Sequence, residues 1–176
     1  MLKIKEIIDS SASSVEFDEY VPFTAEFEAS SLSSPLYWRA GDGKQSLIEV
    51  GLCKQTGSVK SITLTSVKAE NIRKINATYE NDMSAQKGLP IFYLTKWSEE
   101  NESDDFANNF IDEFDLDLQL DIGHGYISVS ILGKEDPVRF VKNNNIVFGF
   151  DTENALSRID IMELLTEDIN IISSAI

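Results

Sequence analysis

Apolar and polar side chains alternate with a period of two along much of the chain, which is the pattern of β-strands with one buried face. The clearest case is residues 48–67, where the polar residues 55–58 interrupt the alternation once. Gly57 stands where a turn between two strands needs a residue with positive φ, and glycine adopts that backbone at little cost. The stretch therefore predicts a β-hairpin.

A second stretch, residues 146–161, repeats this pattern. Gly51 of the first stretch corresponds to Gly149 of the second, and Gly57 corresponds to Asn154 after one residue is lost from the loop. Asparagine is the non-glycine residue that best tolerates the left-handed backbone region, so the match at the turn has a physical basis. We predict two similar hairpins, and either a duplicated β unit or convergence on common turn chemistry explains their likeness.

Alternation and short apolar runs predict the remaining strands. These lie at residues 2–5, 15–18, 23–29, 90–97, 114–122, 126–132 and 138–142. Residues 68–87 hold few large apolar side chains and predict an irregular connection. The last stretch, 164–176, fits a short amphipathic helix or a final strand equally well.

One helix is predicted after Ser103, because serine is a favourable N-cap and Asp104 and Asp105 would follow in the first turn, where carboxylates favour the helix dipole. Phe106 and residues 110–111 would form its buried stripe. The elements together predict an α+β fold dominated by antiparallel strands, with one or two short helices packed on a face. Residues 1–176 are expected to form a single domain.

Composition narrows the classes of function. The 176 residues are 42% hydrophobic, as in folded proteins, and 15 basic residues against 30 acidic ones give a formal net charge of −15. Such a charge repels nucleic acid and anionic membranes, so we expect basic or neutral protein partners. Cys53 is the only cysteine, which fits a reducing compartment, and no apolar run is long enough for a signal peptide or membrane span. The sequence predicts a cytoplasmic protein.

The acidic residues gather in one segment. Residues 98–132 contain ten carboxylates and no lysine or arginine, whereas ordinary solvated surfaces intersperse both signs. The segment is either a solvated face or a docking surface for a basic protein, since surfaces of one sign steer association. An exposed aromatic residue beside it would be a natural binding anchor. The predicted partner-binding residues are Asp104, Asp105, Asp112, Glu113, Asp115, Asp117 and Asp121.

No motif predicts catalysis, a cofactor or a metal. Asp115, Asp117 and Asp121 lie at every-other-residue positions, as the acidic ligands of a calcium-binding loop do. The central glycine and the final glutamate of such a loop are missing, so the alternation of a β-strand explains this spacing better. His124, the only histidine, could act with Cys53 only if the fold brought the two side chains together. We therefore expect a protein without enzymatic activity.

A small acidic β-rich chain with a segment of one charge sign and no catalytic constellation resembles the bacterial immunity proteins of contact-dependent inhibition and polymorphic-toxin systems. Residues 49–64 are also similar to a stretch of bacterial proteins encoded near such toxins. The resemblance implies a non-catalytic protein, monomeric or homodimeric, that binds a cognate, basic, nuclease-type toxin domain and occludes it. An acidic adaptor without a toxin partner, or an enzyme of unrecognised type, are the alternatives.

Overall fold

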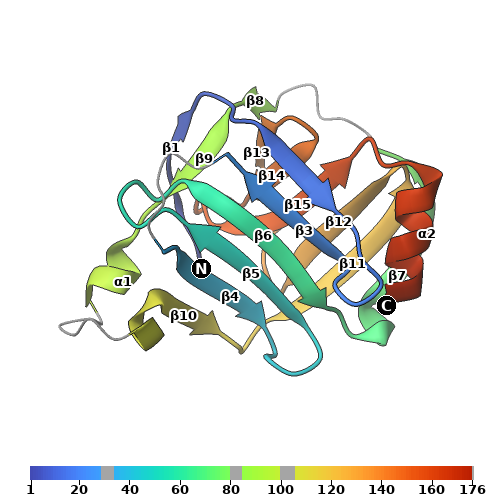
Figure 1. Ribbon diagram of the computed structural model, residues 1–176, viewed down its shortest axis with the longest axis horizontal. Helices are drawn as coiled ribbons and strands as arrows, with labels where there is room; N and C mark the ends of the chain where they lie inside the picture. The colour runs from blue at the N-terminus through green and yellow to red at the C-terminus, as the bar shows by residue number, and fades with distance from the viewer. Residues whose placement is uncertain (29–33, 80–84, 100–105, 176) are drawn as a thin grey trace.

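The computed structural model describes residues 1–28, 34–79, 85–99 and 106–175, and it contains two β-sheets that face each other (Figure 1). The six-stranded sheet consists of β2 (Ser13–Glu16), β3 (Phe23–Phe27), β4 (Leu36–Gly41), β5 (Leu47–Leu52), β6 (Val59–Ser66) and β10 (Phe110–Glu113). The seven-stranded sheet consists of β7 (Ile72–Thr78), β8 (Gln86–Lys87), β11 (Asp117–His124), β12 (Tyr126–Leu132), β13 (Arg139–Asn143), β14 (Ile146–Phe150) and β15 (Leu156–Met162).

The remaining elements are short. A two-stranded ribbon pairs β1 (Ile4–Ile8) with β9 (Leu89–Phe92). The helices are α1 (Thr95–Glu99), α2 (Thr166–Ala175) and the 3-10 turns η1 (Ala69–Asn71) and η2 (Phe106–Asn109). The prediction of an α+β fold dominated by antiparallel strands is confirmed.

The hydrophobic core lies between the two sheets. In β3, for example, Phe23, Ala25 and Phe27 are buried while the residues between them face solvent, as period-two alternation requires. Phe27 also meets Phe148 of the opposite sheet, with ring centroids 6.1 Å apart. One cluster of buried residues includes side chains from both sheets and from the ribbon. Each sheet therefore has an inner face in the core and an outer face turned away from the other sheet.

Both predicted hairpins form, as β5–β6 and β14–β15. Gly57 has φ of 80° and Asn154 has φ of 60°, so both occupy the left-handed region. In both hairpins the pairing register shifts directly after the matched glycine, between Gly51 and Leu52 and between Gly149 and Phe150. The likeness read from the sequence thus extends to the turn and to the bulge.

The two hairpins lie in different sheets, and these sheets share a strand order. The six-stranded sheet runs β2-β3-β6-β5-β4-β10, and six strands of the other run β11-β12-β15-β14-β13-β8. In both series the first five strands pair antiparallel and the last pairs parallel. The hairpins are therefore equivalent parts of two sheets with the same topology.

The two-stranded ribbon joins both turns in a reciprocal way. The carbonyl of Gly57 accepts a hydrogen bond from the N–H of Phe92 in β9, and the carbonyl of the equivalent Asn154 accepts one from the N–H of Ile4 in β1. The strand β9, from the second half of the chain, thus contacts the hairpin β5–β6 of the first half, and β1, from the first half, contacts the hairpin β14–β15 of the second half. Such exchange is what an approximate two-fold symmetry between the two parts produces.

The structure corrects the prediction of a helix with a buried stripe at Phe106, Phe110 and Ile111. Residues 106–109 form only a 3-10 turn, and residues 110–113 form β10, which pairs parallel with β4. Phe106 is 62% exposed. A parallel partner lying far away in the sequence supplies the backbone hydrogen bonds of β10, and local periodicity cannot reveal such a partner.

Three other expectations are resolved. The stretch 68–87 is not irregular throughout, because it contains β7 and β8. Residues 90–97 are divided between the end of β9 and the start of α1. The final segment forms the helix α2, whose Ile172 side chain is buried.

Candidate protein-binding surface

Four of the predicted partner-binding residues that the structure describes are paired with cations of the chain itself, namely Asp112, Glu113, Asp117 and Asp121. Asp112 accepts two hydrogen bonds from the guanidinium of Arg39, at 2.7 and 2.8 Å. Glu113 forms ion pairs with Lys96 and with the amino group of Met1. Burial alone would raise the pKa of Glu113, but these cations outweigh it and lower the pKa below the usual value. Asp112 therefore joins β10 to β4, and Glu113 joins β10 to α1 and to the N-terminus.

Asp117 and Asp121 are paired as well. Asp117 contacts Lys68 at 2.7 Å and accepts a hydrogen bond from Ser46, so it joins β11 to the turn after β4. Asp121 accepts two hydrogen bonds from Arg73 of the neighbouring β7, each at 2.7 Å. These carboxylates contribute to the seven-stranded sheet rather than to an uncompensated face.

Of the last three predicted residues, the structure describes only Asp115. Asp115 is exposed, in the turn between β10 and β11. Asp104 and Asp105 lie outside the described residues. Asp112 faces outward from the six-stranded sheet, whereas Asp117 and Asp121 belong to the other sheet, so the predicted set is not gathered on one face.

A second segment of one charge sign lies nearer the N-terminus. Residues 6–38 contain seven carboxylates and no lysine or arginine. Within the described residues, Glu16 of β2 and Glu26 of β3 are exposed and form no ion pair. Asp18 and Glu19 continue this charge in the loop between the two strands. The same sequence signal, a run of carboxylates without lysine or arginine, therefore marks this segment as well as residues 98–132.

The pairing register places Glu16 and Glu26 on the outer face of the six-stranded sheet, which is the front sheet in Figure 1. The pairing register places outward side chains in two rows that cross the whole sheet from β10 to β2. The rows are Phe110, Tyr37, Gly51, Ser61, Glu26 and Ser14, and Asp112, Arg39, Glu49, Thr63, Thr24 and Glu16. The face is therefore aromatic at one end and acidic at the other.

Its aromatic end, which we call the aromatic cluster, comprises Tyr37, Phe106, Phe110 and Phe114 around Arg39. The rings of Tyr37 and Phe110 stack with centroids 5.0 Å apart and planes inclined by 13°. Phe106 meets the edge of Phe110 at 5.5 Å, and the Arg39 guanidinium lies 4.5 Å from the Phe110 centroid. Phe106 and Phe114 are exposed, and large exposed aromatic groups beside an arginine are typical of the centre of protein interfaces.

Glu49 sits between the two ends of this face. Its side chain is half-buried between Arg39 and Thr63, and within the described residues it forms no ion pair of its own, since Arg39 is engaged by Asp112. Burial raises the pKa of Glu49; the charge of Arg39 opposes this and that of Asp112 adds to it. Burial, and then the nearby Glu49, also raise the pKa of Tyr37.

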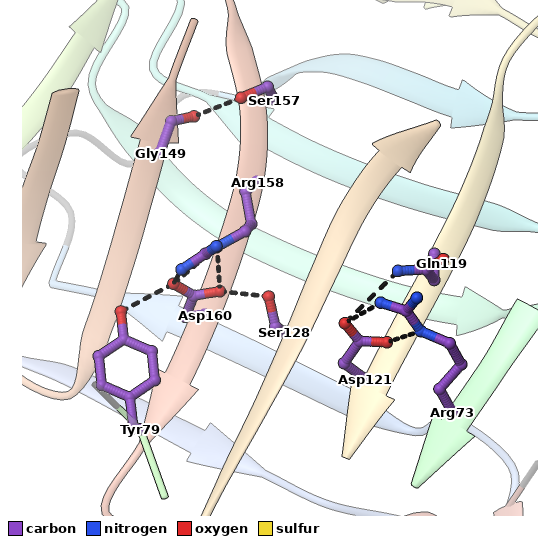
Figure 2. A network of polar contacts seen from close by, with 9 residues as sticks. All are labelled: Arg73, Tyr79, Gln119, Asp121, Ser128, Gly149, Ser157, Arg158 and Asp160. Atoms are coloured by element: carbon purple, nitrogen blue, oxygen red, sulfur yellow. Dashed lines mark hydrogen bonds and ion pairs between the residues drawn. The ribbon is translucent and has the colours of Figure 1, made fainter. Parts of the chain in front are cut away.

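On the outer face of the seven-stranded sheet, the carboxylates of Asp121 and Asp160 are both paired with arginine side chains of the chain itself (Figure 2). Asp160 is fully buried and accepts hydrogen bonds from the Arg158 guanidinium, the Ser128 hydroxyl and the Tyr79 hydroxyl. Burial, and then the charge of Asp160, raise the pKa of Tyr79 well above its ordinary value. The Asp121–Arg73 pair lies across β12 from this network.

The register makes the two outer faces directly comparable. Asp160 and Arg158 on β15 occupy the positions of Thr63 and Ser61 on β6. Asp160 is 0% exposed, whereas Thr63 is half-buried. Tyr79 reaches from the end of β7 and covers Asp160 on the seven-stranded face, whereas the described residues on the outer face of the six-stranded sheet include no fully buried carboxylate.

Cys53 and His124, the two groups considered as a catalytic pair, do not contact each other. Cys53 is buried with its sulfur 3.2 Å from the Gln55 side chain, and His124 contacts Asn76 at 2.6 Å, so the two candidate groups have other partners. No group of three or more histidine, cysteine, aspartate or glutamate side chains suited to a metal ion occurs in the described part of the chain.

The described helices include none with the length and apolar character needed to cross a membrane. No model of a known protein family matches the chain, and no curated protein matches it.

Proposed function

We propose that the protein is a non-catalytic binding protein that neutralises a basic, nuclease-type toxin domain by covering it, as bacterial immunity proteins do. The observation that carries the proposal is the composition of the outer face of the six-stranded sheet. Glu16, Glu26 and Glu49 lie there without ion-pair partners among the described residues, and the aromatic cluster lies at its other end. A charged rim beside aromatic anchors is the usual composition of a tight protein interface.

The mechanism follows from the charges. A net charge of −15 steers a cationic partner from a distance, and the unpaired carboxylates then meet lysine and arginine side chains that the partner uses to hold phosphate groups. Asp112 contributes by fixing Arg39 within the face. We assign Glu113, Asp117 and Asp121 to folding rather than to docking, because their charges are already paired. We place this binding in the cytoplasm, whose reducing conditions suit a single free thiol.

Co-expression tests the proposal. A gene for a secreted protein with a basic, toxic C-terminal domain should lie next to the gene of this protein, and that domain should stop growth when it is expressed alone. Co-expression of the full chain should restore growth. A neighbouring gene without a toxic product, or growth arrest that the chain does not relieve, contradicts the proposal and favours an adaptor.

Charge reversal tests which face is used. The variant E16K/E26K should lose protection, because it places two cations on the acidic end of the face. The variant E70K/E167K changes the net charge equally at exposed positions in η1 and α2, outside the six-stranded sheet, and should protect fully. Equal protection by both variants would show that the partner docks elsewhere.

A further inference from the structure

We infer that Glu49 and the aromatic cluster form the centre of this interface, and that the centre accepts a lysine or arginine side chain of the basic partner. This inference rests on the proposed function and adds the position and the chemistry of the central contact. It commits to a cationic side chain of a protein as the occupant, because Glu16, Glu26 and Glu49 on the same face form no ion pair within the described residues.

The first argument is charge complementarity at Glu49. A half-buried carboxylate is costly unless a cation or hydrogen-bond donors stabilise it. Arg39 lies beside Glu49 in the same row, but Asp112 holds its guanidinium with two hydrogen bonds, so the three groups together carry a net charge of −1. One further cation would balance this set.

The second argument is the aromatic surface next to Glu49. Tyr37 adjoins Glu49 on the neighbouring strand and stacks on Phe110, so a flat aromatic surface borders the carboxylate. Arg39 already lies against the ring of Phe110, which shows that a guanidinium packs well at this surface. A second cationic side chain can lie over the rings and reach Glu49 with its charged end.

The third argument comes from the equivalent face of the other sheet. There Asp160 is covered by an arginine and by a tyrosine hydroxyl that both belong to the chain (Figure 2). On the six-stranded sheet the acidic group is one strand away, at Glu49, and the chain supplies no equivalent cover among its described residues. The seven-stranded sheet shows how a cation and a hydroxyl of the chain can stabilise a carboxylate in the middle of a sheet. On the six-stranded sheet, we infer that a cation of the partner stabilises Glu49 in the same way.

The experiment is an NMR titration of the full chain with a capped tetra-arginine peptide at low ionic strength. The largest shift changes should occur at Tyr37, Glu49, Gly51 and Phe110. The variant E49Q should weaken binding about fivefold, which corresponds to a partly buried ion pair of about 1 kcal/mol. The matched control E70Q, an exposed carboxylate outside the six-stranded sheet, should weaken it less than about twofold.

A second pair of variants tests the aromatic part. Phe106 and Leu165 are 62% and 69% exposed, so alanine at either position should leave the fold intact, which circular dichroism can verify. F106A should weaken peptide binding at least about threefold and L165A should not change it. The inference is overturned if the largest shifts lie on the β2–β3 loop or on the seven-stranded sheet, or if each variant behaves like its control.

The result is separable from that of the co-expression test. A chain that binds the peptide at Glu49 but protects no cell retains the cation site and contradicts the proposed function. A chain that protects cells, with full protection also by E49Q and F106A, keeps the proposed function and overturns this inference alone.

Discussion

The buried carboxylate of Asp160 gives the sharpest prediction about stability. Alanine at this position would remove an acceptor that is 0% exposed and that three side chains contact, namely Tyr79, Ser128 and Arg158. Hydrogen bonds to a charged group contribute about 1.5–3 kcal/mol each, and breaking a buried ion pair costs about 3–5 kcal/mol. The Arg158 side chain is 30% exposed and regains water, so we take the lower end and expect a loss of about 3 kcal/mol.

Urea-induced unfolding at neutral pH, followed by circular dichroism, measures this loss. The control is D121A, whose partner Arg73 is 56% exposed, so that pair should contribute at most about 1 kcal/mol. The double variant R158M/D160L should recover part of the stability, because it replaces the ion pair by apolar side chains. If D160A lost no more stability than D121A, the account of a buried, mutually dependent network would be wrong.

Three further predictions concern single groups. Above pH 10.0, the ordinary pKa of tyrosine, Tyr79 ionises in the unfolded chain but stays protonated in the folded one, so the free energy of unfolding should fall as the pH rises further. Alkaline denaturation curves of Y79F should show a smaller fall than those of the unmodified protein. G57A should destabilise the protein by about 3 kcal/mol, because a Cβ would lie 2.2 Å from the Phe92 carbonyl oxygen. N154G should change the stability measured in thermal melts by no more than about 1 kcal/mol, because glycine adopts the positive φ of Asn154 without strain. Burial raises the pKa of Asp117, but Lys68 lowers it more, so this pKa lies below its usual value. D117N should therefore reduce the free energy of unfolding by up to about 1 kcal/mol at neutral pH, and by nothing once the pH falls below the lowered pKa. A reduction that does not depend on pH would refute this account.

Sequence patterns predicted the strands and turns that are stabilised by residues nearby in the sequence. The hairpins at residues 48–67 and 146–161 were predictable because turn chemistry and alternation are both written in adjacent residues. The strand at residues 114–122 corresponds to β11, with Leu118 and Leu120 fully buried. What failed was β10, whose aromatic residues suggested a helical stripe but owe their places to β4.

The candidate site was less predictable for a related reason. A run of acidic residues in the sequence says nothing about which cations the fold brings to them, and Arg39, Lys68 and Arg73 all come from outside the run. The prediction that an exposed aromatic residue would serve as an anchor beside the run stays a prediction, with Phe106 as a specific candidate. Carboxylates such as Glu26 were overlooked because alternation alone explained them as the solvent side of a strand.

The exchange of strands through the ribbon has a consequence for biosynthesis. Lys3 pairs with Glu153, 150 residues further along, and the neighbouring β1 hydrogen-bonds to the turn of the last hairpin. In a nascent chain β1 can pair with β9 once residues 89–92 have left the ribosome, but the contacts of Lys3 and Ile4 with the last hairpin form only when nearly the whole polypeptide has emerged. Contacts of such sequence separation slow folding, and the final native arrangement is expected only after translation has ended.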